Sequence, residues 1–245
     1  MTAVNKQNYI FPLQAYFGTY LLDIRGLKPR TVSHYFTSIN VISKWLQNKK
    51  LLKQSLFEIT DLKHLLSLQN ILMHDVDFIA KDEKGNRMYS VGLNRYLDFV
   101  QGRFFKENQV DIKKLDRPIP KASTKTNSTA VWQRSSIIRK QAMEYADYKC
   151  EYGPDHQTFI AESNMRPYME GHHALPMHLQ PKFDYSLDIY ANIICLCPIC
   201  HRRIHFALKE EKITMLTAIF NARQERLIQS GIALSKDEFI DMVLQ

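Results

Sequence analysis

Cysteine and histidine side chains are concentrated in one part of this 245-residue sequence. Its four cysteines are Cys150, Cys195, Cys197 and Cys200, and six of its nine histidines fall between residues 156 and 205. A secreted disulfide scaffold would spread its cysteines along a short chain, and the N-terminal residues lack the basic-then-apolar layout of a signal peptide. We therefore expect a cytoplasmic protein with reduced thiols, in which these side chains bind metal ions.

The cysteines predict a zinc site. The spacing of Cys197 and Cys200, with two residues between them, is typical of a zinc knuckle. Tetrahedral zinc needs two more ligands, and Cys150 is the first candidate. For the last we favour His156; Cys195 is the alternative, although as a strand neighbour of Cys197 it competes for the same face. Four protein ligands leave no open position, so this Zn²⁺ is expected to be structural.

The histidines predict a second, separate metal site. His172 and His173 are adjacent in an expected strand, so their side chains point to opposite faces, and one can bind a metal while the other faces a water molecule. His201 and His205 are four residues apart on a short helix expected to begin at Pro198, so they share a face that could hold one ion. Histidine titrates near neutral pH, which suits a base that removes a proton from water.

Three segments in this region carry a family resemblance. CEYGPDHQTF begins at Cys150, YMEGHHALPM begins at Tyr168, and ANIICLCPICHRRIH begins at Ala191. Taken together and in this order, residues 150–206 resemble the HNH nucleases, in particular restriction-type members with a zinc-binding ββα core. Many of those proteins have a second Cys-x-x-Cys where this sequence has Gly153, so another group must complete the zinc site here.

The resemblance implies a role for each residue of the histidine motif. His172 and His205 would bind the catalytic ion, and His173 would be the general base. His201 would be a further ligand or a phosphate contact, and Asn192 would hold the loop between the two strands. Histidine-rich ligation admits several divalent ions, of which Mg²⁺ or Mn²⁺ is expected in cells.

Three charged residues near this motif are candidates for supporting roles. Glu170 could accept a hydrogen bond from one of the ligand histidines, or be a solvated strand carboxylate. Arg202 and Arg203 are expected at the mouth of the site, where they could clamp the scissile phosphate. For each arginine, a solvated position on the helix is the alternative.

Apolar residues at three- and four-residue spacing predict four helices before residue 107. Gly26 is expected to stop the first of them, and Pro29 to begin the second. The stretch from Tyr16 to Trp45 is also similar to the helical core-binding domain of tyrosine recombinases, which implies a DNA-recognition role for residues 1–107; a generic helical bundle is the alternative.

The sequence changes character after these helices. Residues 108–135 are rich in Pro, Ser, Thr and Lys and lack apolar periodicity, so we expect a basic linker there. Between residues 113 and 149, nine Lys or Arg stand against three Asp or Glu, which supplies six of the net charge of +8. Such a segment can follow DNA phosphates, and Lys121, Lys125 and Arg134 are the expected contacts. A merely solvated tether is the alternative.

These observations combine into one expectation. The fold should be mainly α with a small α+β part: a helical domain (1–107), the linker (108–135) and a ββα-metal nuclease domain (136–245). No apolar run is long enough to span a membrane. The expected function is endonucleolytic cleavage of double-stranded DNA by a restriction enzyme, sequence-specific or modification-dependent. Because one site per chain must cut two strands, we expect a homodimer. A homing, phage or repair nuclease, or a non-catalytic DNA-binding zinc module, are the alternatives.

Overall fold

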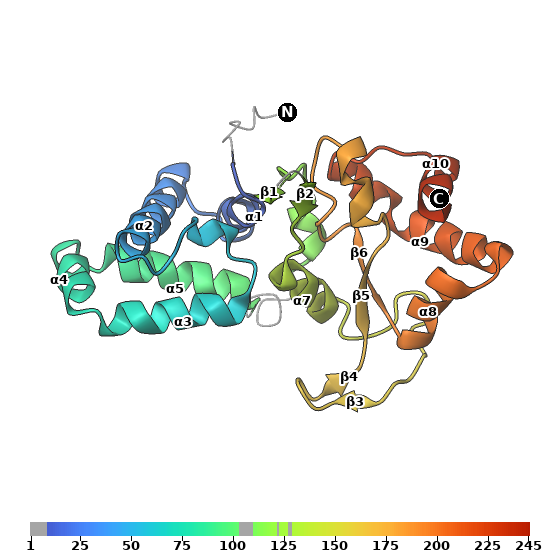
Figure 1. The fold of residues 1–245 in the computed structure, drawn as a ribbon, viewed down its shortest axis with the longest axis horizontal. Coiled ribbons are helices and arrows are strands. Elements are labelled where there is room, and N and C mark those ends of the chain that lie inside the picture. The colour runs from blue at the N-terminus through green and yellow to red at the C-terminus, as the bar shows by residue number, and fades with distance from the viewer. Residues whose placement is uncertain (1–8, 103–109, 122, 127–128) are drawn as a thin grey trace. The chain divides into compact units, whose positions relative to one another are not determined.

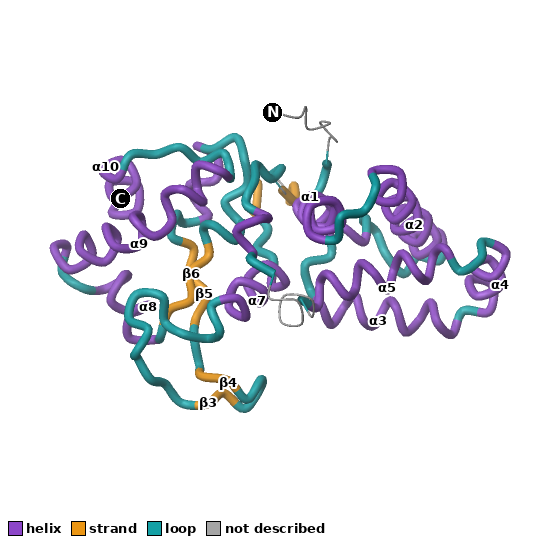
Figure 2. The backbone as a smooth tube through the Cα atoms, turned by 180° about the vertical axis from the view of Figure 1, so that it is seen from behind, coloured by secondary structure: helices purple, strands orange, loops and turns teal. Residues whose placement is uncertain are grey.

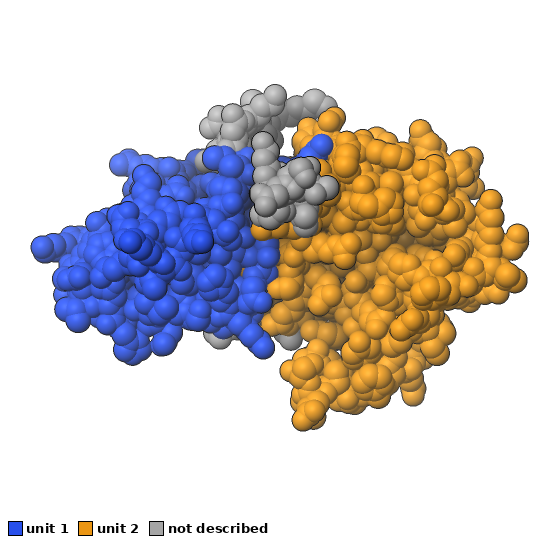
Figure 3. Space-filling view, viewed as in Figure 1, with its two compact units in different colours: residues 1–100, 120–122 blue, residues 101–119, 123–245 orange. Residues whose placement is uncertain are grey.

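The computed structural model describes residues 9–102, 110–121, 123–126 and 129–245. Its described part is mainly helical and contains three two-stranded antiparallel sheets (Figures 1 and 2), in agreement with the expected mainly α architecture with a small β component. The chain divides into two compact units (Figure 3): residues 1–100 with 120–122, and residues 101–119 with 123–245. No helix in the described ranges has both the length and the apolar character that a bilayer span requires.

The first unit is a bundle of helices. Its elements are α1 (Pro12–Thr19), a π-helical turn that continues it (Tyr20–Ile24), α2 (Pro29–Asn48), a 3₁₀ turn (Leu56–Glu58), α3 (Leu62–His74), α4 (Val76–Lys84) and α5 (Met88–Gln101). Gly26 has a φ of +63°, which suits glycine after a helix end, and Pro29 begins α2 as expected. Helix α4 was not predicted; Asp75 ends α3 and its side chain accepts hydrogen bonds from the first turn of α4.

Aromatic side chains form the core of this bundle. Phe17 of α1 lies 5.2 Å from Tyr96 and 5.5 Å from Phe99 of α5, measured between ring centroids. Phe57 of the 3₁₀ turn packs edge-on against Tyr96 at 5.2 Å. All four rings are almost completely buried, and such contacts add to the stabilisation from apolar burial.

The second unit surrounds a strand–strand–helix arrangement. Its elements are a 3₁₀ turn (Ile112–Leu115), β1 (Ser123–Thr126), β2 (Thr129–Trp132), α7 (Ser136–Tyr145), β3 (Ile160–Ala161), β4 (Arg166–Pro167), β5 (Glu170–His173), a 3₁₀ segment (Met177–Lys182), β6 (Ile193–Leu196), α8 (Pro198–Phe206), α9 (Lys209–Gln229) and α10 (Lys236–Leu244). The expected capping box is present at the start of α10, where the side chains of Ser235 and Glu238 each bond the other's backbone N–H.

The segment expected to be a linker departs from that expectation. Residues 112–115 form a 3₁₀ turn, and β1 and β2 form a hairpin. Ile112, Leu115 and Ile119 are at most 1% exposed. The Asp116 carboxylate accepts two hydrogen bonds from Arg226 of α9, at 2.5 and 3.1 Å, and its side chain is fully buried. Residues 110–119 therefore belong to the second unit, to which three buried apolar side chains and one buried ion pair attach them.

The hairpin of β5 and β6 is the frame on which the site is built. In its antiparallel register, His172 is opposite Ile194 and His173 is opposite Ile193. Helix α7 contacts both strands, and α8 follows β6 directly and also contacts both. Figure 1 shows the two strands running between α7 and α8.

Candidate functional site

Three histidines from two elements meet at one point of the second unit. One ring nitrogen each of His172, His201 and His205 lies within 4.8 Å of the others. Their ring centroids are 4.9–5.1 Å apart, and His205 Nε2 is 3.3 Å from His201 Nε2. Strand β5 supplies the first ring and successive turns of α8 supply the other two, because residues four apart share a helix face.

The histidine cluster has the chemistry of a metal site. Among the residues that the structure describes, buried His172 Nε2 finds no hydrogen-bond partner, and an unpaired buried polar atom is costly unless a ligand satisfies it. Burial, followed by the neighbouring His201 and His205, lowers the pKa of His172 to about 3. Burial also lowers the pKa of His205, with His201 contributing next. Neutral imidazole is the form that binds metal ions, so a divalent cation fits this donor set.

Glu170 orients one member of the cluster. His201 Nδ1 forms a short hydrogen bond with Glu170 Oε2, two residues before His172 on β5. Nδ1–H donates this hydrogen bond to the carboxylate, so the lone pair of the ring is on Nε2, which faces the other histidines. This is the arrangement in which a carboxylate fixes the tautomer of a ligand histidine.

His173 lies on the opposite face of β5 and has a different partner. Its Nε2 is 2.8 Å from Asp188 Oδ1, and both side chains are largely buried. Asp188 Oδ2 accepts the Ser135 N–H at 2.6 Å, so the carboxylate is held at both oxygens. Asp188 is a site residue that the sequence analysis missed, since nothing in the spacing of residues 173 and 188 signals the contact.

Asn192 spans the loop between the two strands with its side-chain amide. Its Oδ1 accepts the Leu175 N–H at 2.7 Å, and its Nδ2 donates to the carbonyls of Leu175 and Leu187 at 2.9 and 2.8 Å. The side chain is completely buried. One amide therefore ties together both ends of the 174–191 loop and places Asp188 next to His173.

A second cluster combines three cysteines and one histidine. Ligand atoms of Cys150, His156, Cys197 and Cys200 lie within 4.8 Å of one another, and the three thiols are buried. His156 Nδ1 is 3.3 Å from Cys200 Sγ and 3.5 Å from Cys197 Sγ. This buried Cys₃His set could hold a zinc ion.

The first part of the cluster is formed by a tight turn between Cys150 and His156. Burial opposes ionisation of Cys150, yet N–H groups of Cys197, Gly153 and Tyr152 lower the pKa of its thiol to about 7, which favours the thiolate that binds metal. A Cβ on Gly153 would lie 2.4–2.8 Å from three atoms of the His156 ring. The glycine therefore leaves the space that the imidazole fills.

Cys195, the alternative zinc ligand, lies outside this cluster. It is 1% exposed and packs against Met143 and Tyr148. Burial raises the pKa of its thiol well above the usual range, with the Glu151 carboxylate contributing next. A neutral thiol in an apolar cluster is a core residue.

The candidate DNA contacts differ in their local surroundings. The guanidinium of Arg202 lies over the Phe206 ring at 5.8 Å. Arg203 forms an ion pair with Glu211 at 3.1 Å and lies over Tyr152, so it is already engaged. Arg134 is exposed and Lys121 is partly buried, and the side chain of Lys125 lies outside the described residues.

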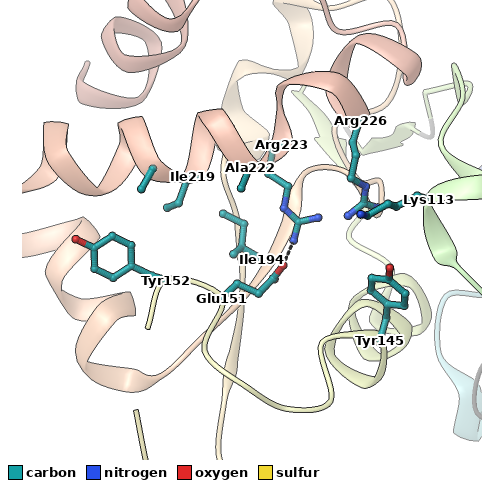
Figure 4. A pocket seen from close by; sticks show the side chains of 10 residues that line it. Lys113, Tyr145, Glu151, Tyr152, Ile194, Ile219, Ala222, Arg223 and Arg226 are labelled. Carbon is teal, nitrogen blue, oxygen red and sulfur yellow. Dashed lines mark hydrogen bonds and ion pairs between the residues drawn. The ribbon is translucent and has the colours of Figure 1, made fainter. Parts of the chain in front are cut away.

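A cavity of about 320 Å³ beside β6 is lined by an ion pair of which only the arginine is buried (Figure 4). Arg223 of α9 forms a short ion pair with Glu151 and donates to the Ile193 carbonyl at 3.2 Å. Glu151 also accepts the Cys195 N–H through its second oxygen at 2.6 Å. Because these charged groups satisfy each other, their role here is to fasten α9 to the β6 edge.

The chain is similar to one characterised nuclease. No family model matches it. A segment of 97 residues is 28% identical to the type IV methyl-directed restriction enzyme EcoKMcrA of Escherichia coli (strain K12), and it covers 39% of this chain and 32% of that protein. The chain thus spans about a third of the length of this relative. Partial similarity to a restriction enzyme supports a restriction-type nuclease, which is the class that the sequence analysis expected.

Proposed function

We propose that this protein is an HNH endonuclease that hydrolyses phosphodiester bonds of double-stranded DNA. The observation that carries the proposal is that two adjacent histidines of β5 have different partners on opposite faces of the strand. His172 joins a three-histidine cluster and His173 pairs with a buried carboxylate. Asn192 supports this arrangement by closing the loop that carries Asp188.

The proposed roles of the side chains follow from their contacts. His173 Nε2–H donates a hydrogen bond to Asp188, which keeps the ring proton on Nε2 and leaves the lone pair on Nδ1 to take a proton from water. The water oxygen forms a new bond to phosphorus while the bond from phosphorus to the 3′ oxygen breaks. The leaving oxygen takes up a proton from solvent, which yields a 5′ phosphate and a 3′ hydroxyl. His172, His201 and His205 would hold Mg²⁺ or Mn²⁺, and Glu170 would keep His201 in the ligand tautomer. When bound, the ion stabilises charge on the phosphate and on the leaving oxygen.

The Cys₃His cluster would bind a structural zinc ion. With zinc bound, these four side chains would fill all positions of a tetrahedral site, so no position would remain for a substrate. We include Cys150, His156, Cys197 and Cys200 in this set and leave out Cys195.

Restriction is the biological role that we propose. The relative is named as a methyl-directed restriction enzyme, which favours a modification-dependent enzyme over one that cuts only unmodified sites. Assembly as a homodimer would bring two sites to the two strands.

The proposal is tested by cleavage of methylated and unmethylated plasmid DNA with Mg²⁺ or Mn²⁺, with and without EDTA. We expect metal-dependent cutting that EDTA abolishes. His173→Ala should remain folded and retain zinc, yet cleave about 10²- to 10⁴-fold more slowly. His178→Ala is the matched control because His178 is exposed. DNA binding by the wild type without cleavage under any of these conditions would instead favour a non-catalytic zinc module.

A further inference from the structure

A groove begins at the histidine cluster and runs along α7. Its volume is about 460 Å³, and its lining includes Arg139 and Lys140 of α7, Tyr168 beside β4, and Glu170 with His201 at the cluster. Because the last two residues belong to the candidate site, anything that fills the groove lies next to the histidines.

Arg139 is the central cation of this groove. Its side chain crosses the backbone of Gly171. If residue 171 had a Cβ atom, the Cγ and Cδ atoms of Arg139 would lie only 2.6 and 2.9 Å from it. Gly171 lies between Glu170 and His172 on β5, so the arginine side chain packs against the strand that bears His172. Arg139 is exposed, and no hydrogen bond or ion pair with another described residue holds its guanidinium. It is therefore free to bind an anion.

The neighbouring charges favour the same kind of ligand. Lys140 has one acidic partner among the described residues, Glu144, at the long distance of 3.9 Å with the lysine half exposed. Arg166 on β4, two residues before the groove-lining Tyr168, is exposed. The groove carboxylate, Glu170, is already engaged by His201 and by the Tyr168 hydroxyl. An extended anion next to a phosphodiesterase site is most simply the substrate backbone.

The β3–β4 hairpin adds an apolar surface beside this charge. Figures 1 and 2 show it projecting from the body of the second unit below β5. Phe159 stacks on Tyr168, with ring centroids 4.8 Å apart and planes at 16°. Phe159 and Met165 are nevertheless 65% and 74% exposed. Exposed apolar side chains flanked by cations are a combination that proteins use to press against base steps in the minor groove of DNA.

We propose that the groove between α7 and the β3–β4 hairpin receives the sugar–phosphate backbone of duplex DNA on one side of the scissile phosphate. Arg139 and Lys140 contact backbone phosphates, and Phe159 and Met165 press against the edges of the base pairs. This inference rests on the proposed nuclease function, and it names the surface on which the substrate lies.

The test uses the full-length protein in the His173→Ala background, so that DNA binding is measured without cleavage. Arg139→Gln should weaken binding to a short duplex roughly tenfold, the value of one charge-assisted contact. It should also lower the slope of log affinity against log salt by about 0.9. Lys236→Gln, a change at an exposed cation of α10, is the control and should change neither quantity. An unchanged slope and affinity for Arg139→Gln overturn the proposal.

A second measurement addresses the hairpin. Phe159→Ala and Met165→Ser should reduce the fluorescence increase of a duplex that contains 2-aminopurine at the contacted step, whereas Ile228→Ser on α9 should not. Loss of self-association in these hairpin variants, with DNA binding unchanged, would assign the surface to a second copy of the chain and overturn the proposal.

If the wild type cuts DNA and Arg139→Gln cuts equally well at low DNA concentration, the groove proposal alone fails. If the wild type cuts no DNA with any divalent ion, the proposed function itself fails.

Discussion

Replacement of Asp188 by Asn tests the base assignment most directly. The Asp188 carboxylate accepts two hydrogen bonds, one from the Ser135 N–H at 2.6 Å and one from His173 Nε2 at 2.8 Å. An asparagine has one oxygen and one NH₂ group at these positions. Because the Ser135 N–H can only donate, the asparagine oxygen must face it and the NH₂ group must face His173. The ring then has to accept at Nε2, so its proton moves to Nδ1 and the lone pair for water is lost.

The magnitude follows from the cost of the other amide orientation. That orientation places NH₂ against the Ser135 N–H and leaves two buried donors unpaired, at about 1–3 kcal/mol each. A total of roughly 2–6 kcal/mol predicts a fall in cleavage rate between about 30-fold and 10⁴-fold, with the upper end limited by what a general base contributes.

The assay is single-turnover cleavage at saturating Mn²⁺, with thermal unfolding and zinc content measured on the same samples. Asp184→Asn is the control, since Asp184 is exposed in the same loop. A folded, zinc-containing Asp188→Asn protein that cleaves within about threefold of the wild-type rate would refute the tautomer argument.

Three further predictions concern the metal sites and the packed linker. Gly153→Ala should lower zinc content and thermal stability, because its Cβ overlaps the imidazole ligand, whereas Cys195→Ala should retain one zinc per chain by elemental analysis. His205→Ala should lose activity through weaker ion binding, so that excess Mn²⁺ restores part of the rate in a metal titration; failure of rescue would argue against a ligand role. Asp116→Ala should lower the unfolding midpoint by roughly 6–20 °C in calorimetry, because it leaves Arg226 buried without its partner; an unchanged midpoint would mean that this segment is only a tether.

The parts of the fold that sequence reasoning found are those with a local physical signal. Apolar stripes gave the long helices, and Gly26, Pro29 and the Ser235–Glu238 pair marked helix boundaries that the structure confirms. Helix α4 was not predicted because it is short and because a single residue, Asp75, both ends α3 and caps the start of α4.

The candidate site divides in the same way. The spacing within Cys197–Cys200 and within His201–His205 reflects the geometry of a single helix start, so both clusters could be proposed from the sequence. Asp188 could not, since it reaches His173 through a loop without periodicity. The attachment of residues 110–119 to the second unit was also not predicted, because it depends on a contact with α9 more than a hundred residues away.

The start of α8 contributes side chains to both clusters within nine residues, so the two clusters share one element. Cys197 caps the helix and Cys200 lies in its first turn, while His201 and His205 follow directly. A newly synthesised chain that has not yet taken up zinc would lack the fixed helix start that aims the two histidines. Under the roles proposed above, the nuclease would be inactive until zinc is bound, so catalysis with the second metal ion would depend on the supply of zinc.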